Sequence, residues 1–260
     1  MLFAPALDAR LAALRAEVRA IECAAARRAE GRPCLAFGLA EIDDRLAGGG
    51  LAGGLHEVAA ASPAPGDDTA ATLFLAALAA RFAIAAGAGG QVLWALSRRD
   101  LFAPGLAQAG LTPDRLLYAE CRNDEEVLAV MEEGVRHGSL AAMVGEAGRM
   151  AMAAGRRLQL AAEEGGTAAL LLRRWRKAGA DPLGQPSPAM TRWRIACAPS
   201  APLPFAGIGR ARCRVALVRQ RGGPPHEWLL EAPDAEARLA LPARSGDRPD
   251  QAGVAPRIAA

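Results

Sequence analysis

The sequence predicts an α/β protein with a mainly parallel sheet and an antiparallel extension toward its C-terminal side. Two observations predict this class. Between residues 34 and 174, short apolar runs alternate with longer helical stretches, as in successive β–α–β units. After residue 190, three strand-like runs follow one another with no helical stretch between them, which predicts antiparallel pairing. The 260 residues, 52% of them hydrophobic, suffice to bury one such core.

The amino-acid composition indicates the kind of core and the cellular compartment to expect. Aromatic residues make up only 4% of the chain, so we expect an aliphatic core. The net charge of +3 does not by itself imply a polyanionic partner. The five cysteines are scattered without CxxC spacing, as expected for buried thiols in a reducing cytoplasm, and no metal site is expected. Asp8, Arg10 and Arg15 argue against a signal peptide, and no uninterrupted apolar run has membrane-spanning length.

Residues 1–30 are expected to form an N-terminal amphipathic helix, because apolar side chains recur there at spacings of four and three. A break at Gly31 to Pro33 separates this helix from the core. Two interpretations remain open: the apolar seam packs on the protein's own core, or it docks a partner or a second copy. The partner-contact candidates are Leu7, Leu11, Leu14, Val18 and Ile21.

The central elements follow in order. A helix over 123–138 has Asn123 or Asp124 as a plausible N-cap, and a helix over 152–166 ends at glycine. Strands are expected at 56–60, 90–96, 115–121, 140–146 and 167–174, with further helices at about 68–81 and 100–111.

The last part of the core consists of the runs TRWRIACAPS, ARCRVALVRQR and HEWLLEA, read as antiparallel strands. We therefore expect a core domain over 31–232. Residues 233–260 are rich in proline, alanine and charge, which predicts a disordered tail with a short binding segment around 238–241.

The stretch HEVAAASPAPGDDTAATLFLAALAAR has the strand, Pro/Gly loop and helix of a phosphate-binding loop. Such a loop requires a lysine followed by Ser or Thr. Here Gly66 is followed by Asp67, Asp68 and Thr69, and the only lysine of the chain is Lys177. Carboxylates at this place repel phosphate oxygens. We expect Asp67 or Asp68 to cap the following helix instead.

The stretch FGLAEIDDRLAGGGLAGGLHEV resembles the segment of RecA that leads into its phosphate-binding loop, and the similarity in element order covers roughly 34–232. The phrases LFAPGLAQAGL, RLQLAAEEGG and TRWRI resemble the ImuA family within that superfamily. The resemblance implies a RecA-like P-loop NTPase fold.

Compared with RecA-like P-loop proteins, the nucleotide site that the resemblance implies is degenerate in this sequence. The strand-end aspartate of the superfamily falls at Gly145, beside Glu146, whose expected state is a solvated carboxylate. Ser97 and the two arginines after it stand where the catalytic glutamate belongs. With the loop lysine also missing, we expect no enzymatic activity and no cofactor. The alternative is a divergent DNA-dependent ATPase that uses Glu146 and Thr69.

A basic stretch over 170–195 interleaves arginines with tryptophans, a composition typical of single-strand binding. In RecA, a loop at this place faces single-stranded DNA. The other interpretation is a solvated loop whose tryptophans close the core. The DNA-contact candidates are Arg173, Arg174, Trp175, Arg176, Lys177, Arg192 and Arg194.

The resemblance to the ImuA family implies a non-catalytic accessory protein of the DNA-damage (SOS) response. Its implied partners are an ImuB-type inactive relative of Y-family polymerases and an error-prone replicative-type DNA polymerase, in translesion synthesis and mutagenesis. RecA and single-stranded DNA are further candidate partners, and regulation of RecA filaments is an alternative function. The implied location is the cytoplasm, at the nucleoid after damage.

Overall fold

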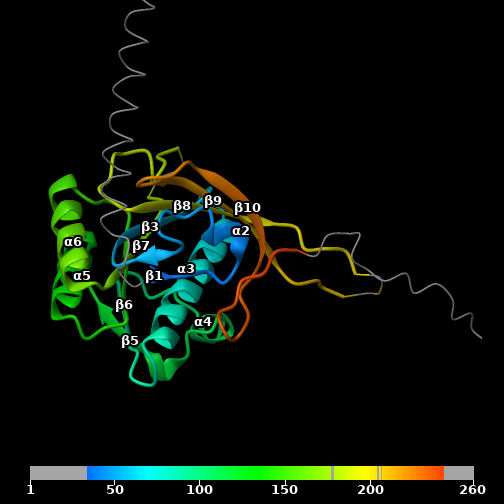
Figure 1. The fold of residues 1–260 in the computed structure, drawn as a ribbon, viewed down its shortest axis with the longest axis horizontal. Coiled ribbons are helices and arrows are strands. Elements are labelled where there is room, and N and C mark those ends of the chain that lie inside the picture. The colour runs from blue at the N-terminus through cyan, green and yellow to red at the C-terminus, as the bar shows by residue number, and fades with distance from the viewer. Residues whose placement is uncertain (1–33, 177–178, 204, 206, 243–260) are drawn as a thin grey trace, which may run out of the picture.

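An eight-stranded mixed sheet runs through the part of the chain that the computed structural model describes, residues 34–176, 179–203, 205 and 207–242 (Figure 1). Its spatial order is β10-β9-β8-β3-β7-β6-β4-β5. The six strands from β8 to β5 pair in parallel, whereas β8–β9 and β9–β10 pair antiparallel, as the sequence predicts. The strands are β3 (Gly54–Ala60), β4 (Val92–Leu96), β5 (Leu116–Glu120), β6 (Ala142–Ala147), β7 (Ala168–Arg173), β8 (Thr191–Ala198), β9 (Arg212–Gln220) and β10 (His226–Glu231).

Helices cover both faces of this sheet. The long helix α3 (Pro65–Ala85) packs on one face, and α5 (Asp124–His137) and α6 (Met152–Gly165) pack together on the other (Figure 1). Smaller elements complete the described fold: α2 (Ala40–Asp43), α4 (Ala103–Gln108), a 3-10 turn at Pro113–Arg115, and a two-stranded sheet of β1 (Cys34–Leu35) and β2 (Leu51–Ala52).

Local signals fix the start of α5 and the ends of α5 and α6. Asn123 caps α5, because its side chain accepts a hydrogen bond from the backbone N–H of Glu126. The helix ends at Gly138, with φ of 73°, and α6 ends at Gly166, with φ of 65°. Both glycines take the left-handed conformation that closes a helix. The sequence-based bounds of these helices are confirmed.

Helix α3 starts three residues before its predicted start. Pro65 is its first residue, Ala64 occupies the N-cap position, and no side chain caps it. Proline suits this place because the first N–H groups of a helix lack intrahelical partners. Asp67 and Asp68 therefore lie in the first turn, and the expectation that one of them is the N-cap is wrong. By length and hydropathy α3 matches a membrane span, yet here half of it is buried against the sheet.

The core is mostly aliphatic, as expected, but on the face of α3 it contains an aromatic cluster. Trp193 is fully buried there, with its ring 5.7 Å from that of Phe37, 5.9 Å from Phe74 and 6.2 Å from Trp228. Four of the aromatic residues thus pack together in one cluster. The opposite face is filled by aliphatic and methionine side chains such as Met131 and Met143.

The described residues continue past the end of β10 and stay in contact with the core. Ala237 and Leu239 are buried, and the backbone N–H of Glu231 donates to the carbonyl of Ala240. Residues 233–242, which the sequence places in the tail, therefore lie against the core. Residues 243–260 and the seam from Leu7 to Ile21 lie outside the described residues.

Candidate functional site

One edge of the sheet gathers residues that are distant in sequence. The carboxyl ends of parallel strands lie at the same edge, which is where α/β proteins bind their ligands. Glu146 lies on β6, Asp100 follows β4, and Arg174 comes directly after β7. The first turn of α3 adds Asp68. Residues that are distant in sequence therefore meet at this edge, with an arginine between three carboxylates.

The guanidinium of Arg174 joins three chain segments. Its Nε and Nη2 each lie 2.9 Å from Oε2 of Glu146, and its Nη1 lies 2.5 Å from Oδ2 of Asp68. Asp100 is 4.0 Å from Nη2. Burial acts to lower the pKa of Arg174, but the charges and hydrogen bonds of Glu146 and Asp68 outweigh it and raise that pKa. Arg174 is thus a permanent internal cation.

Glu146 is buried, and the expectation of a solvated strand-end carboxylate is wrong. Its Oε1 accepts a hydrogen bond of 2.8 Å from the indole of Trp94, while Oε2 binds Arg174. The neighbouring Gly145 faces α5 instead: a Cβ there would lie 2.2 Å from the sulfur of Met131. Because successive side chains of a strand point to opposite faces, Glu146 is the strand-end carboxylate on the face of α3.

The two aspartates in the first turn of α3 make internal contacts. Asp67 accepts hydrogen bonds from the hydroxyl of Ser62, at 2.6 Å, and from the backbone N–H of Cys197, at 2.7 Å. Within the stretch Gly66, Asp67, Asp68 and Thr69, Asp67 therefore links the start of α3 to β8, and Asp68 links it to Arg174. Negative charge also suits the first turn of a helix.

A cavity of about 320 Å³ adjoins Arg174. Its walls include Thr69 and Phe102 together with the partly exposed carboxylates of Asp68 and Asp100. Among the described residues that line it, Arg174 is the only cationic one. Two carboxylates against one guanidinium disfavour a polyphosphate, which carries several negative charges.

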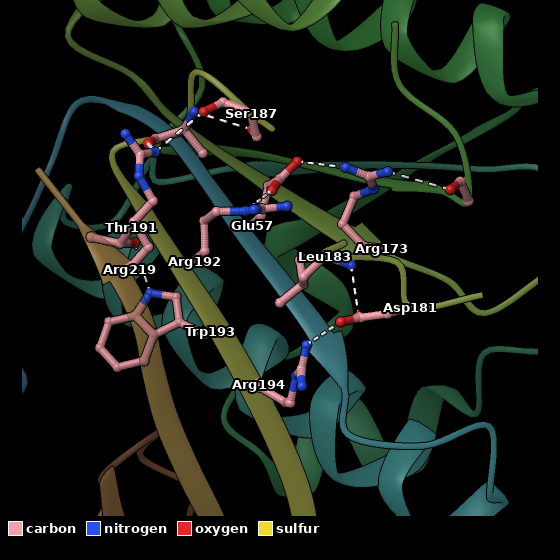
Figure 2. Close-up of polar contacts among 12 residues, drawn as sticks. Glu57, Arg173, Asp181, Leu183, Ser187, Thr191, Arg192, Trp193, Arg194 and Arg219 are labelled. Atoms are coloured by element: carbon pink, nitrogen blue, oxygen red, sulfur yellow. Dashed lines mark hydrogen bonds and ion pairs between the residues drawn. The ribbon is translucent and has the colours of Figure 1, made fainter. Parts of the chain in front are cut away.

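A second ion cluster lies on the opposite face of the sheet, around Glu57 of β3 (Figure 2). Oε1 of Glu57 lies 2.6 Å from Nη1 of Arg173, and Oε2 lies 2.6 Å from Nε of Arg192. Glu57 is completely buried, and both arginines are more than nine-tenths buried. One carboxylate thus balances two guanidiniums, and the side chain that organises the basic stretch is a glutamate that sequence reasoning did not single out.

The basic stretch is mostly internal. Arg173, Arg174 and Arg192 are buried in ion pairs, so the expectation that they contact DNA does not fit their positions. Trp193 lies in the core, and the indole of half-buried Trp175 donates to the carbonyl of Ala60. The exposed members are held by carboxylates: Arg176 lies 2.9 Å from Asp124, and Arg194 lies 2.5 Å from Asp181 (Figure 2). Lys177 is outside the described residues.

A basic cavity of about 400 Å³ opens beside this stretch. Arg149 and Arg176 supply its exposed cations, and Arg173 and Arg174 form part of its wall, with Asp181 as the lining carboxylate. Arg149 was missed by sequence reasoning, because it stands alone after β6. Only the fold brings it beside the segment that follows β7.

His56 has a structural position. Its Nδ1 lies 2.8 Å from the hydroxyl of Thr191, and its Nε2 lies 2.8 Å from the carbonyl of Ala52. Burial lowers the pKa of His56 to about 4, against a smaller raising effect of the Ala52 hydrogen bond. The described residues contain no group of three or more His, Cys, Asp or Glu side chains placed to hold a metal ion.

Known proteins were compared with the chain as a whole. No protein-family model matches it. It is 41% identical over 209 residues to the Protein ImuA of Caulobacter vibrioides strain NA1000 / CB15N, an alignment that covers 78% of this chain and 85% of the relative. The Protein ImuA of strain ATCC 19089 / CIP 103742 / CB 15 matches with the same identity and coverage. Identity of this extent reaches well beyond the loop and the basic stretch.

Proposed function

The chain belongs to the ImuA family, and from that premise we propose that it is a non-catalytic, RecA-like accessory protein of the SOS mutagenesis system. In this proposal it works in the cytoplasm with an ImuB-type inactive relative of Y-family polymerases and an error-prone replicative-type polymerase. Their joint task is translesion synthesis, with induced mutagenesis as its consequence.

The position of Arg174 carries the non-catalytic part of this proposal. An ATP site of this fold class needs a loop cation for the phosphates and a free carboxylate for Mg²⁺. Here the loop contributes carboxylates, and Glu146 is already bound by Trp94 and Arg174. In this proposal, the ion pairs of Arg174 with Glu146 and Asp68 occupy the place of the metal and phosphates. This part of the fold then needs no bound nucleotide to hold its shape.

Equilibrium binding of a fluorescent ATP analogue with Mg²⁺ tests this part, with a RecA-type ATPase as positive control. We expect no saturable binding at micromolar nucleotide. A micromolar dissociation constant that disappears on Thr69→Ala would establish the alternative, a divergent ATPase.

The partner part is tested separately, by capture of the tagged chain from cells after DNA damage. The proposal expects the inactive polymerase relative and the error-prone polymerase to be recovered together. Recovery of RecA in their place would instead support a regulator of RecA filaments. The same capture from undamaged cells is the control.

A further inference from the structure

Two cysteines lie directly opposite each other on adjacent strands. In the antiparallel pairing of β8 with β9, Cys197 faces Cys213. Because side chains of directly opposed residues project to the same face, the two thiols share one side of the sheet. Both are free thiols in this structure.

The hydrogen-bond pattern fixes the type of this pair. The backbone N–H of Cys197 donates to Asp67, away from β9, and the carbonyl of Ile195 accepts from Ala61 on the same side. Cys197 and Cys213 therefore form a non-hydrogen-bonded pair of the ladder. In such pairs the Cα atoms are about 4.5 Å apart, within the usual range of disulfides, about 4.4–6.8 Å.

The two thiols differ in access. Cys197 is exposed and lies against the first turn of α3. A Cβ placed on Gly66 of that turn would lie 3.8 Å from the sulfur of Cys197. Cys213 is buried beneath it, and burial, with a smaller effect of Cys197, raises its pKa to about 11. An oxidant from solution therefore meets Cys197 first, and Cys213 is the neighbouring thiol that can complete a bond.

We propose that Cys197 and Cys213 are a reversible oxidation site, at which a hydroperoxide converts the two thiols into a disulfide between β8 and β9. The sulfur of Cys197 attacks a peroxide oxygen and breaks the O–O bond, which gives a sulfenic acid and one water when hydrogen peroxide is the oxidant. The sulfur of Cys213 then displaces the sulfenic oxygen as a second water, and the S–S bond forms. Two thiols and one peroxide thus give one disulfide and two waters.

The location of the bond gives it a consequence. Cys197 and Cys213 lie at the base of the connection between β8 and β9, which carries the exposed apolar side chains of Phe205 and Ile208. A disulfide there closes that connection into a covalent loop and restricts its conformations. In a reducing compartment a disulfide between an exposed and a buried thiol is transient and redox-responsive rather than permanent.

The test uses the full chain, treated with hydrogen peroxide, blocked with a thiol-alkylating reagent and digested without reduction. Mass spectrometry is expected to find the peptides of Cys197 and Cys213 linked, two of the five thiols lost to titration, and both recovered with dithiothreitol. Cys34→Ser, which removes another exposed thiol, should keep the link. Cys197→Ser should abolish it while leaving the circular dichroism spectrum unchanged.

Two results would overturn the proposal. One is oxidation of Cys197 to sulfinic acid with Cys213 still reduced, and the other is a linkage of Cys197 to any other cysteine. Because the experiment reads a covalent bond in the isolated chain, its outcome is independent of the partners and of nucleotide binding.

Discussion

The guanidinium of Arg174 lies 2.9 Å from the buried carboxylate of Glu146 and takes up the space between the end of β6 and the start of α3. In P-loop nucleotide-binding proteins, the space between the loop and the strand end serves Mg²⁺ and phosphate. Here the side chains of Arg174 and Glu146 occupy this space, so their ion pair is part of the fold.

We predict that Arg174→Met destabilises the protein by roughly 3–5 kcal/mol, because Glu146 is left buried and charged without its partner. Denaturant unfolding followed by circular dichroism measures this change. The double variant Arg174→Met with Glu146→Gln should recover much of the loss. Exposed Arg157→Met is the control, with a change within about 0.5 kcal/mol. An equal loss of unfolding free energy in Arg174→Met and in the control Arg157→Met would contradict a structural role for Arg174.

Glu57→Gln should likewise destabilise the protein by roughly 3 kcal/mol, because the buried Arg173 and Arg192 lose the charge that they share. The control is Glu227→Gln, whose carboxylate is exposed and paired with exposed Arg214. Thermal unfolding of both variants checks the prediction. A Glu57 variant as stable as the Glu227 variant would show that the cluster contributes nothing to folding.

Stability should fall as the pH is lowered from about 6.5 toward 4. His56 has a folded-state pKa of about 4, below its ordinary 6.5. The unfolded chain therefore binds a proton in this window that the folded chain does not, a linkage effect of up to about 3 kcal/mol. His56→Asn should flatten this part of the stability profile, whereas exposed His137→Asn should not. Unfolding free energies at several pH values provide the measurement, and an unchanged slope in His56→Asn would refute the assignment.

Deletion of residues 1–30 should leave a cooperatively melting core and remove a partner contact or a self-contact. The apolar seam of that segment precedes the core in the sequence, across a break that contains Gly31 and Pro33. Circular dichroism melts and size-exclusion chromatography of the truncated and full chains test this. An unfolded truncated protein would place the Leu7–Ile21 seam in the chain's own core.

If the basic cavity faces single-stranded DNA, the contacts are to phosphate and come from exposed Arg149 and Arg176. Changing both to glutamine should weaken oligonucleotide binding and lower the salt slope by about one unit per lost contact. Arg214→Gln with Arg238→Gln, two exposed arginines on β9 and after β10, removes the same charge at the other end of the sheet. Fluorescence anisotropy over a salt series measures this, and equal weakening by both pairs would indicate a non-local charge effect.

The sequence by itself determined the order and type of the elements between residues 34 and 232. Periodicity, the Asn123 cap and the terminal glycines act over a few residues, so they are readable before the chain folds. The likeness to the ImuA family was also readable, since it lies in runs of adjacent residues, and 41% identity bears it out.

Only the tertiary structure decided which charges are internal. In the sequence, Arg173, Arg174 and Arg192 resemble a solvated basic stretch. Their buried partners are distant: Glu57 is 116 residues from Arg173 and 135 from Arg192, and Glu146 is 28 residues from Arg174. The same holds for the facing of Cys197 and Cys213, which depends on the register between β8 and β9. Ion pairing and strand register arise from long-range packing of the mixed sheet, and a local pattern carries no information about either.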